Sequence, residues 1–511
     1  AWALCFVGAH LLARELGLGR IGASAAGVAF AYAPYRITEA GHLHVISSGG
    51  IPLALFLLLR GYRRWGNTGQ SGADTGESTA SGQAGARSGS STRLLVAGWL
   101  VVAWQISLGF TLGLQFAYLL AILTLIWAVH WWRAGRPALP PKLVAITCAG
   151  IALVGIVTIY EARPYLKISH DYPTARRPLM EVKRYSAGPE ALLAASSENR
   201  VWGDATAPLR ADLSSQNESV LFPGLTILLL AGLGLAGAGR AGGAVGTRDD
   251  RAGAGLGLGA TPFPWGLRIG LALCAVTCAV LALGFGLTGA GYPYRLLYDH
   301  APGWNGVRVP GRVFTLATLS LALLAGAGAQ RLVGVARARG GRVSPLWRDG
   351  LPALVGLVLL AGLLGEGAGR MAHPVVPRPA PAEIGLPAPI LDLPTDSASD
   401  RVWQFFSTEG FPKIANGTST FDIPAQDDLR GGMSGFPDRA SVEKLRWYGI
   451  RTVVLHLRLP KLPGLHGFGV AEPPDPEAAA VKPVTGLGIT RRRVGEVVIY
   501  EIGPGPKALH A

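Results

Sequence analysis

Long runs of apolar residues recur along the first 370 residues and are separated by short connectors rich in arginine. The runs are blocks of Leu, Ala, Val and Gly without the alternation of a half-buried strand, so they predict helices. A spanning helix needs about 20 such residues, and a bilayer admits backbone only as helices or closed barrels. We expect about ten spans, at 1–13 (a truncated span), 21–34, 49–61, 94–109, 112–130, 143–160, 219–238, 267–287, 313–331 and 351–369.

The pattern changes near Arg370, after which the chain has the shorter apolar segments of a water-soluble domain. These segments predict strands at 388–393, 451–456 and 496–502 and an amphipathic helix at 441–448. The expected fold is therefore an all-α polytopic membrane bundle, residues 1–369, followed by a small α/β domain, residues 370–511.

Composition agrees with this interpretation and narrows the class of protein. Mean hydropathy is +0.33 and charged residues make up 15% of the chain, below the average of about 25% in soluble domains. The net charge of +15 does not indicate a nucleic-acid partner, because the arginines lie in connectors and no lysine-rich patch with interleaved aromatics occurs. The four cysteines all fall inside apolar runs and are interpreted as small buried hydrophobes.

The arginines also predict an orientation, because basic connectors stay on the cytoplasmic side of a membrane. They concentrate in alternate connectors, two of which (66–92 and 240–260) are rich in Gly, Ser and Ala and are expected to be flexible. The loops at 35–48, 161–218 and 288–312 and the C-terminal domain are then expected on the opposite, extracytoplasmic side.

The loop at 35–48 contains a cation, a carboxylate and two imidazoles in a stretch of nine residues between two apolar runs. Arg36, Glu39, His42 and His44 are candidates for a reactive or phosphate-binding site, since ionisable groups at a membrane boundary are costly and often functional. The alternative is structural: Arg36 would extend toward the interface and the histidines would cap the next helix.

A second candidate site lies in the loop at 288–312, where three arginines oppose the charge rule. Arg308 and Arg312 are four residues apart at a predicted helix start, and Arg295 precedes them. Arginine binds phosphate through paired donors, so a lipid phosphate is the expected anion at this depth. An ordinary interfacial anchor is the alternative.

The first apolar run, Ala1–Leu12, is too short to span a membrane, and its charged neighbours Arg14 and Glu15 follow it instead of preceding it. A signal peptide has the opposite order. We therefore expect the sequence to lack an N-terminal part of the protein.

Three segments resemble a broad group of bacterial membrane proteins related to the GT-C glycosyltransferases. They are FAYAPYRITEAGHLHVISSGGIPLALFLLLR, PGWNGVRVPGRVFTLATLSLALLAGAGAQRL, and STEGFPKIANGTSTFDIP with LRWYGIRTVVLH. The resemblance implies a bundle in the bacterial cytoplasmic (inner) membrane. It also implies that a sugar passes, with inversion, from a polyprenyl-phosphate donor to an envelope glycan, lipid or protein on the outer face, in contact with membrane lipids.

In that family an acidic residue of the first outer loop acts as base or metal ligand, and no residue of this sequence matches it. Glu39, with His42 and His44 beside it, is the catalytic candidate by position alone, and Arg36, Arg295, Arg308 and Arg312 are the candidates for binding the lipid phosphate. The resemblance allows a divalent metal ion, for which the sequence indicates no ligands.

Two other functions remain open from the sequence. A lipid or polysaccharide transporter or flippase would place ionisable groups near the middle of the spans, commonly within internal repeats, and neither feature is found in this sequence. A non-catalytic scaffold for envelope assembly would use the outer domain to bind a partner.

Overall fold

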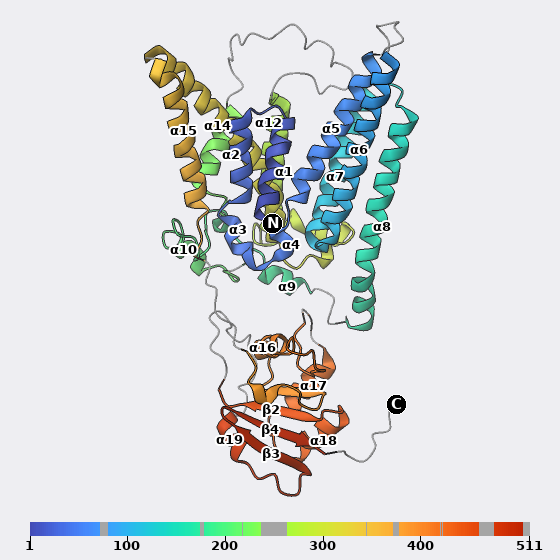
Figure 1. Cartoon of the computed structure of the whole chain (residues 1–511), viewed down its shortest axis with the longest axis vertical. Helices are drawn as coiled ribbons and strands as arrows, with labels where there is room; N and C mark the ends of the chain where they lie inside the picture. The colour runs from blue at the N-terminus through green and yellow to red at the C-terminus, as the bar shows by residue number, and fades with distance from the viewer. Residues whose placement is uncertain are drawn as a thin grey trace. The chain divides into compact units, whose positions relative to one another are not determined.

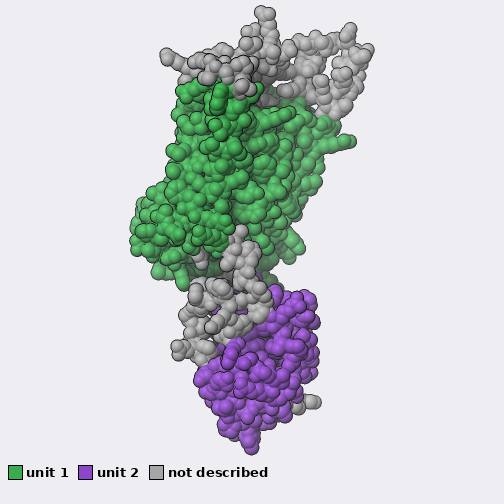
Figure 2. All heavy atoms as spheres, turned by 60° about the vertical axis from the view of Figure 1, so that its left-hand side comes forward, with its two compact units in different colours: residues 1–167, 177–371 green, residues 168–176, 372–511 purple. Residues whose placement is uncertain are grey.

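The computed structural model describes residues 1–71, 80–173, 178–216, 218–236, 263–343, 345–370, 378–419, 421, 423–458 and 475–503. The protein is mostly helical and forms two compact units (Figures 1 and 2). Unit 1 comprises residues 1–167 and 177–371, and unit 2 comprises residues 168–176 and 372–511.

Each apolar run of unit 1 forms a helix. These helices are α1 (Trp2–Glu15), α2 (Arg20–Ala31), α5 (Gly50–Ser71), α6 (Ala80–Ser107), α7 (Phe110–Arg133), α8 (Pro141–Asp171), α11 (Leu225–Ala236), α12 (Trp265–Ala282), α14 (Phe314–Val343) and α15 (Pro345–Glu366).

Six helical segments among the described residues are long and apolar enough to cross a membrane. They are Leu43–Trp65, Phe110–Arg133, Pro141–Asp171, Trp265–Ala282, Pro310–Gly340 and Asp349–Glu366. Helices α1, α2 and α11 are shorter, with 14, 12 and 12 residues. The six long helices support a multi-pass membrane protein, and the remaining expected spans stay predictions.

Two predicted connectors are shorter than expected. Helix α5 continues to Ser71 and α6 already begins at Ala80, so most of the predicted flexible loop 66–92 is helical. Residues 66–71 and 80–92 contain no proline, a residue that ends or kinks a helix. The helices of the adjoining apolar runs can therefore continue into them. Residues 72–79 and the second predicted flexible loop, 240–260, lie outside the described residues. Helix α8 likewise continues to Asp171, which removes 161–171 from the predicted loop 161–218.

Helix α14 is the centre of unit 1. It packs against α2, α11, α12 and α15, and its span is almost entirely buried. The span of α8, in contrast, is almost entirely exposed, with Ile156 and Ile159 among its outward side chains. An apolar helix exposed in this way would face lipid in a bilayer.

The contact between α11 and α14 depends on two glycines. A Cβ added to Gly234 would lie 2.0 Å from the carbonyl oxygen of Leu324, and one added to Gly328 would lie 2.0 Å from that of Leu230. Small residues of this kind let apolar helices approach closely and pack without a hydrophobic driving force between them.

We expect Gly328→Val to lower the free energy of unfolding by at least about 1–3 kcal/mol, because the new side chain would force α11 away from α14. Unfolding in detergent measures the loss. Gly334→Val is the matched control on the same helix, since a Cβ there meets nothing within 4 Å. Equal stabilities of the two variants would contradict the close packing.

Short elements connect the long helices of unit 1. They are α3 (Tyr35–Thr38), η1 (Glu39–Gly41), α4 (Leu43–Ile46), α9 (Leu179–Arg184), η3 (Pro189–Leu192), α10 (Ala207–Ala211), α13 (Tyr294–His300), η6 (Trp304–Gly306) and η7 (Pro310–Val313). Figure 1 shows α3, α4, α9 and α10 at one end of unit 1, away from the α14–α15 junction. Which end faces the cytoplasm stays a prediction from the arginine distribution.

Unit 2 contains a mixed four-stranded sheet. Its strands are β1 (Ile390–Leu393), β2 (Thr452–His456), β3 (Ile489–Val494) and β4 (Val497–Ile502), in the order β1-β2-β4-β3. Strands β1 and β2 are parallel, whereas β4 is antiparallel to both β2 and β3. The helical elements of unit 2 are η8 (Pro381–Glu383), α16 (Ser399–Phe406), α17 (Pro424–Gly432), α18 (Arg439–Trp447) and α19 (Pro476–Val481).

The sequence therefore located β1, β2, β4 and α18 correctly to within two residues at each end. It missed β3, because five of the six residues of this edge strand are exposed and three of them are arginines, which gives no apolar alternation. Alternate residues of β1 and β2 pack into two different clusters. Leu391 and Val453 contact the larger core with α18, and Ile390 and Val454 contact the smaller one with Ile414.

Candidate functional site

Four ionisable side chains meet at the end of unit 1 that contains α3 and α4. We call Glu39, His42, Glu218 and Arg312 the carboxylate–imidazole cluster. His42 Nδ1 lies 3.0 Å from Glu39 Oε2, and His42 Nε2 lies 3.5 Å from Glu218 Oε1. Arg312 Nη2 lies 3.3 Å from the other oxygen of Glu218. One imidazole thus bridges two carboxylates, and an arginine closes the chain of ion pairs.

The local fold explains how these groups meet. The single turns α3 and η1 follow Pro34, and they place Glu39 and His42 three residues apart, within reach on one side of a helical turn. The Tyr35 hydroxyl lies 3.3 Å from Glu39 Oε1 and 3.3 Å from the Gly311 carbonyl oxygen. Tyr35 therefore joins α3 to η7, the element that carries Arg312.

Burial makes the pairing necessary. The side chains of Glu39 and Glu218 are 1% and 18% exposed, and those of His42 and Arg312 are 28% and 14% exposed. A buried carboxylate is tolerated when it is paired and hydrogen-bonded, because removing its charge from water costs several kcal/mol.

The surroundings of His42 and Glu218 shift the pKa of each group. Hydrogen bonds to Glu218 and Glu39 outweigh burial and raise the pKa of His42 to about 9. Burial raises the pKa of Glu218, but the hydrogen bond to His42 and the charge of Arg312 outweigh it and hold that pKa below its ordinary value. At neutral pH His42 is therefore an imidazolium ion and Glu218 an ionised carboxylate.

These states change the roles that the sequence suggested. As an imidazolium ion, His42 is not a base at neutral pH and instead positions the two carboxylates. His44 packs edge-on against it, with ring centroids 6.0 Å apart. Glu39 is almost inaccessible, whereas Glu218 is ionised and partly exposed. Glu218, not Glu39, is the carboxylate of this cluster that a reacting group can reach.

The arginines at 308 and 312 each hold a carboxylate of their own. Arg308 Nε lies 2.8 Å from Glu181 Oε1, and its guanidinium covers the Tyr185 ring at 4.6 Å. Both arginines thus pair with carboxylates in this structure, and their convergence on one anion stays a prediction. The sequence missed Glu181 and Glu218 because the loop around them has no charge bias, and their partners lie about a hundred residues further along the chain.

Arg36 is a structural cation. It is 1% exposed and donates hydrogen bonds to the Ile46 carbonyl oxygen at 2.7 Å and the Ser48 hydroxyl at 3.0 Å. Its guanidinium also lies over the rings of Trp2 and Phe30, each at 5.2 Å. This enclosure favours a structural role for Arg36, and its role in phosphate binding stays a prediction.

The third arginine of the predicted site, Arg295, pairs within its own helix. It forms an ion pair with Asp299 one turn along α13, and the two side chains are 45% and 42% exposed. Exposed pairs of this spacing contribute a few tenths of a kcal/mol. The structure gives Arg295 no place in the carboxylate–imidazole cluster.

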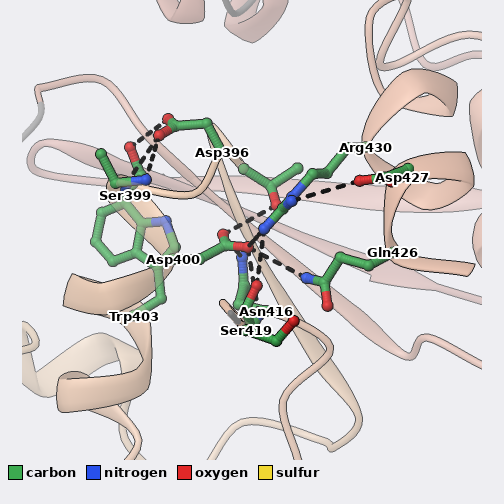
Figure 3. A network of polar contacts seen from close by, with 12 residues as sticks. Asp396, Ser399, Asp400, Trp403, Asn416, Ser419, Gln426, Asp427 and Arg430 are labelled. Carbon is green, nitrogen blue, oxygen red and sulfur yellow. Dashed lines mark hydrogen bonds and ion pairs between the residues drawn. The ribbon is translucent and has the colours of Figure 1, made fainter. Parts of the chain in front are cut away.

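A second polar network lies in unit 2 and is centred on Asp400 (Figure 3). Asp400 is fully buried, and its carboxylate accepts hydrogen bonds from Arg430 at 2.8 Å and from Asn416 at 2.9 Å. Thr395, Gln426 and the backbone N–H of Gly417 donate to it as well. These five donors satisfy the carboxylate, so we interpret this network as structural.

Comparisons with known proteins assign no identity to the chain. No protein-family model matches it, and no curated protein matches it.

Proposed function

We propose that this protein is an integral membrane glycosyltransferase that transfers a sugar from a polyprenyl-phosphate donor to an envelope acceptor on the extracytoplasmic face. The carboxylate–imidazole cluster is the observation on which the proposal rests. It combines an accessible carboxylate with an arginine at one end of a bundle of apolar helices, where a lipid-linked donor would present its phosphate. The resemblance of three sequence segments to the GT-C group supports the same reaction.

The proposed chemistry uses two members of the cluster directly. Glu218 accepts the proton of the acceptor hydroxyl while the acceptor oxygen bonds to the anomeric carbon and the bond from that carbon to the phosphate oxygen breaks. Arg312 donates to the departing phosphate, which stabilises the charge that develops on it. Its side chain is 14% exposed and already lies beside Glu218, so the two groups are within reach of one substrate. Glu39 and His42 position Glu218.

The place of the cluster favours transfer over transport. Transporters and flippases commonly bind their substrates near the middle of the membrane, between discontinuous helices. The carboxylate–imidazole cluster instead involves the short turns η1 and η7 at the end of unit 1.

We expect Glu218→Gln to lower sugar transfer at least about 100-fold, because an amide cannot accept the hydroxyl proton. Arg312→Ala should lower it comparably through loss of phosphate stabilisation. The assay is transfer from a synthetic polyprenyl-phosphate sugar by the full chain in proteoliposomes. Arg439→Ala is the control, since Arg439 forms an exposed pair with Glu443 in unit 2. Unchanged transfer by correctly inserted Glu218→Gln protein would refute the proposal.

A further inference from the structure

A group of three potential metal ligands lies in unit 2, apart from the carboxylate–imidazole cluster. Asp392 is the third of the four residues of β1, and His456 is the last residue of β2. Since β1 and β2 are adjacent and parallel, both residues lie at the carboxyl ends of their strands. This edge is where ligands bind in sheets with parallel strands. Glu383 approaches from η8.

We propose that Glu383, Asp392 and His456 bind one divalent transition-metal ion. One potential ligand atom from each residue lies within 4.8 Å of the other two, and His456 Nε2 is 2.9 Å from Asp392 Oδ1. Ligand atoms bound about 2.0–2.2 Å from one ion are about 3–4 Å apart. The three side chains therefore need only a small closure to share an ion.

Neighbouring groups already hold the three side chains in place. The His456 ring stacks on Trp403, with centroids 3.9 Å apart and planes at 14°. Asn416 holds the backbone of Asp392 on both sides: its side-chain oxygen accepts from Asp392 N at 2.6 Å, and its Nδ2 donates to Asp392 O at 2.8 Å. Glu383 Oε1 accepts from Ala380 N at 3.0 Å, which leaves Oε2 for an ion. Such supporting contacts orient the ligands of a metal site.

The charge of the group is a second, independent reason to expect a cation. Asp392 is 7% exposed and Glu383 is half-buried, yet within the described part of the chain neither carboxylate pairs with an arginine or lysine. Asp400, buried in the same unit, receives Arg430 and four further donors. Among the described residues, the two carboxylates beside the His456 imidazole have no arginine of this kind to balance their charge. A divalent ion would balance that charge, because buried charges are paired or coordinate metals.

The donor set indicates the class of ion. One imidazole nitrogen with two carboxylate oxygens suits Zn²⁺, Mn²⁺ or Fe²⁺, whereas Ca²⁺ and Mg²⁺ prefer all-oxygen ligands.

The test is equilibrium dialysis of the full chain in detergent against Zn²⁺ and, separately, Mn²⁺, with the bound metal measured. The wild-type chain should bind one ion. Glu383→Gln should lower the affinity for that ion at least about tenfold, because a ligand is lost. Glu383→Gln should fold, because its amide oxygen can still accept from Ala380 N. His456→Gln should also lose the ion.

His170→Gln is the matched control, because His170 pairs with Asp171 in unit 2 at 3.2 Å but the pair is exposed. This variant should bind the ion as wild type does. The proposal is overturned if the wild-type chain binds neither ion, or if Glu383→Gln and His456→Gln bind it as tightly as wild type. Neither outcome depends on sugar transfer, so the proposed function is tested separately.

Discussion

Replacing Asp400 by alanine should lower the free energy of unfolding of unit 2 by about 3–5 kcal/mol, because it removes the buried partner of Arg430 and leaves a cavity. Arg430 is only 18% exposed, and its Nη2 donates to both Asp400 and the Gly417 carbonyl oxygen. Asn416, Thr395 and Gln426 would lose an acceptor at the same time. Pulse proteolysis of the full chain in urea, following fragments of residues 378–503, measures the change.

Asp427→Ala is the matched control for that experiment. Asp427 also pairs with Arg430, at 3.7 Å, but it is 53% exposed. Exposed ion pairs contribute about 0–1 kcal/mol, so this variant should remain within about 1 kcal/mol of wild type. Similar losses for Asp400→Ala and Asp427→Ala would show that burial of the Asp400 network does not stabilise unit 2.

The second large effect is a loss of stability at alkaline pH through His42. Its pKa of about 9 in the folded protein lies above the value of about 6.5 in an unfolded chain. The stabilisation is fully present below pH 6.5 and disappears as the pH rises through 9, since the charge that bridges Glu39 and Glu218 is then lost. The shift corresponds to at most about 3 kcal/mol. Detergent-solubilised protein unfolded at a series of pH values between 6 and 10 measures it.

Glu218 acts in the opposite direction at acid pH. Its pKa is lowered in the folded protein, so its contribution is present above the unfolded value of about 4.3 and is lost as the pH falls. The His42→Gln variant isolates the alkaline effect, and it should be less stable than wild type at pH 6 with little further loss up to pH 9. His130→Gln, at the exposed end of α7, is the control. Parallel profiles for wild type and His42→Gln would exclude His42 as the titrating group.

Much of the fold could be predicted because its signals are local. Every apolar run of unit 1 is a helix. A continuous block of Leu, Ala and Val about 20 residues long predicts a helix without reference to the rest of the chain. Helix ends were less certain: α5 and α6 continue into polar residues that contain no proline, and α8 continues past Pro164 to Asp171. Strand β3 was missed because its arginines are exposed at the edge of the sheet.

The candidate site could be predicted only in part. The sequence singled out Glu39, His42 and Arg312, and these do meet, but it gave no means of pairing them with Glu218. It also could not distinguish Arg36, which is 1% exposed and lies over the rings of Trp2 and Phe30, from Arg312, which is 14% exposed and pairs with Glu218. Both are arginines next to apolar runs, and their difference lies in what surrounds them.

By itself the sequence determined that this protein is a chain of apolar helices followed by a small α/β region, because hydrophobicity and its period are properties of neighbouring residues. The tertiary structure alone decided which charges meet. Arg312 contacts Glu218, which is 94 residues away in the sequence, and His456 contacts Asp392, which is 64 residues away. The secondary-structure preferences of neighbouring residues carry no information about such partners. Buried charges must pair, but the path of the folded chain determines which charges lie within reach of one another.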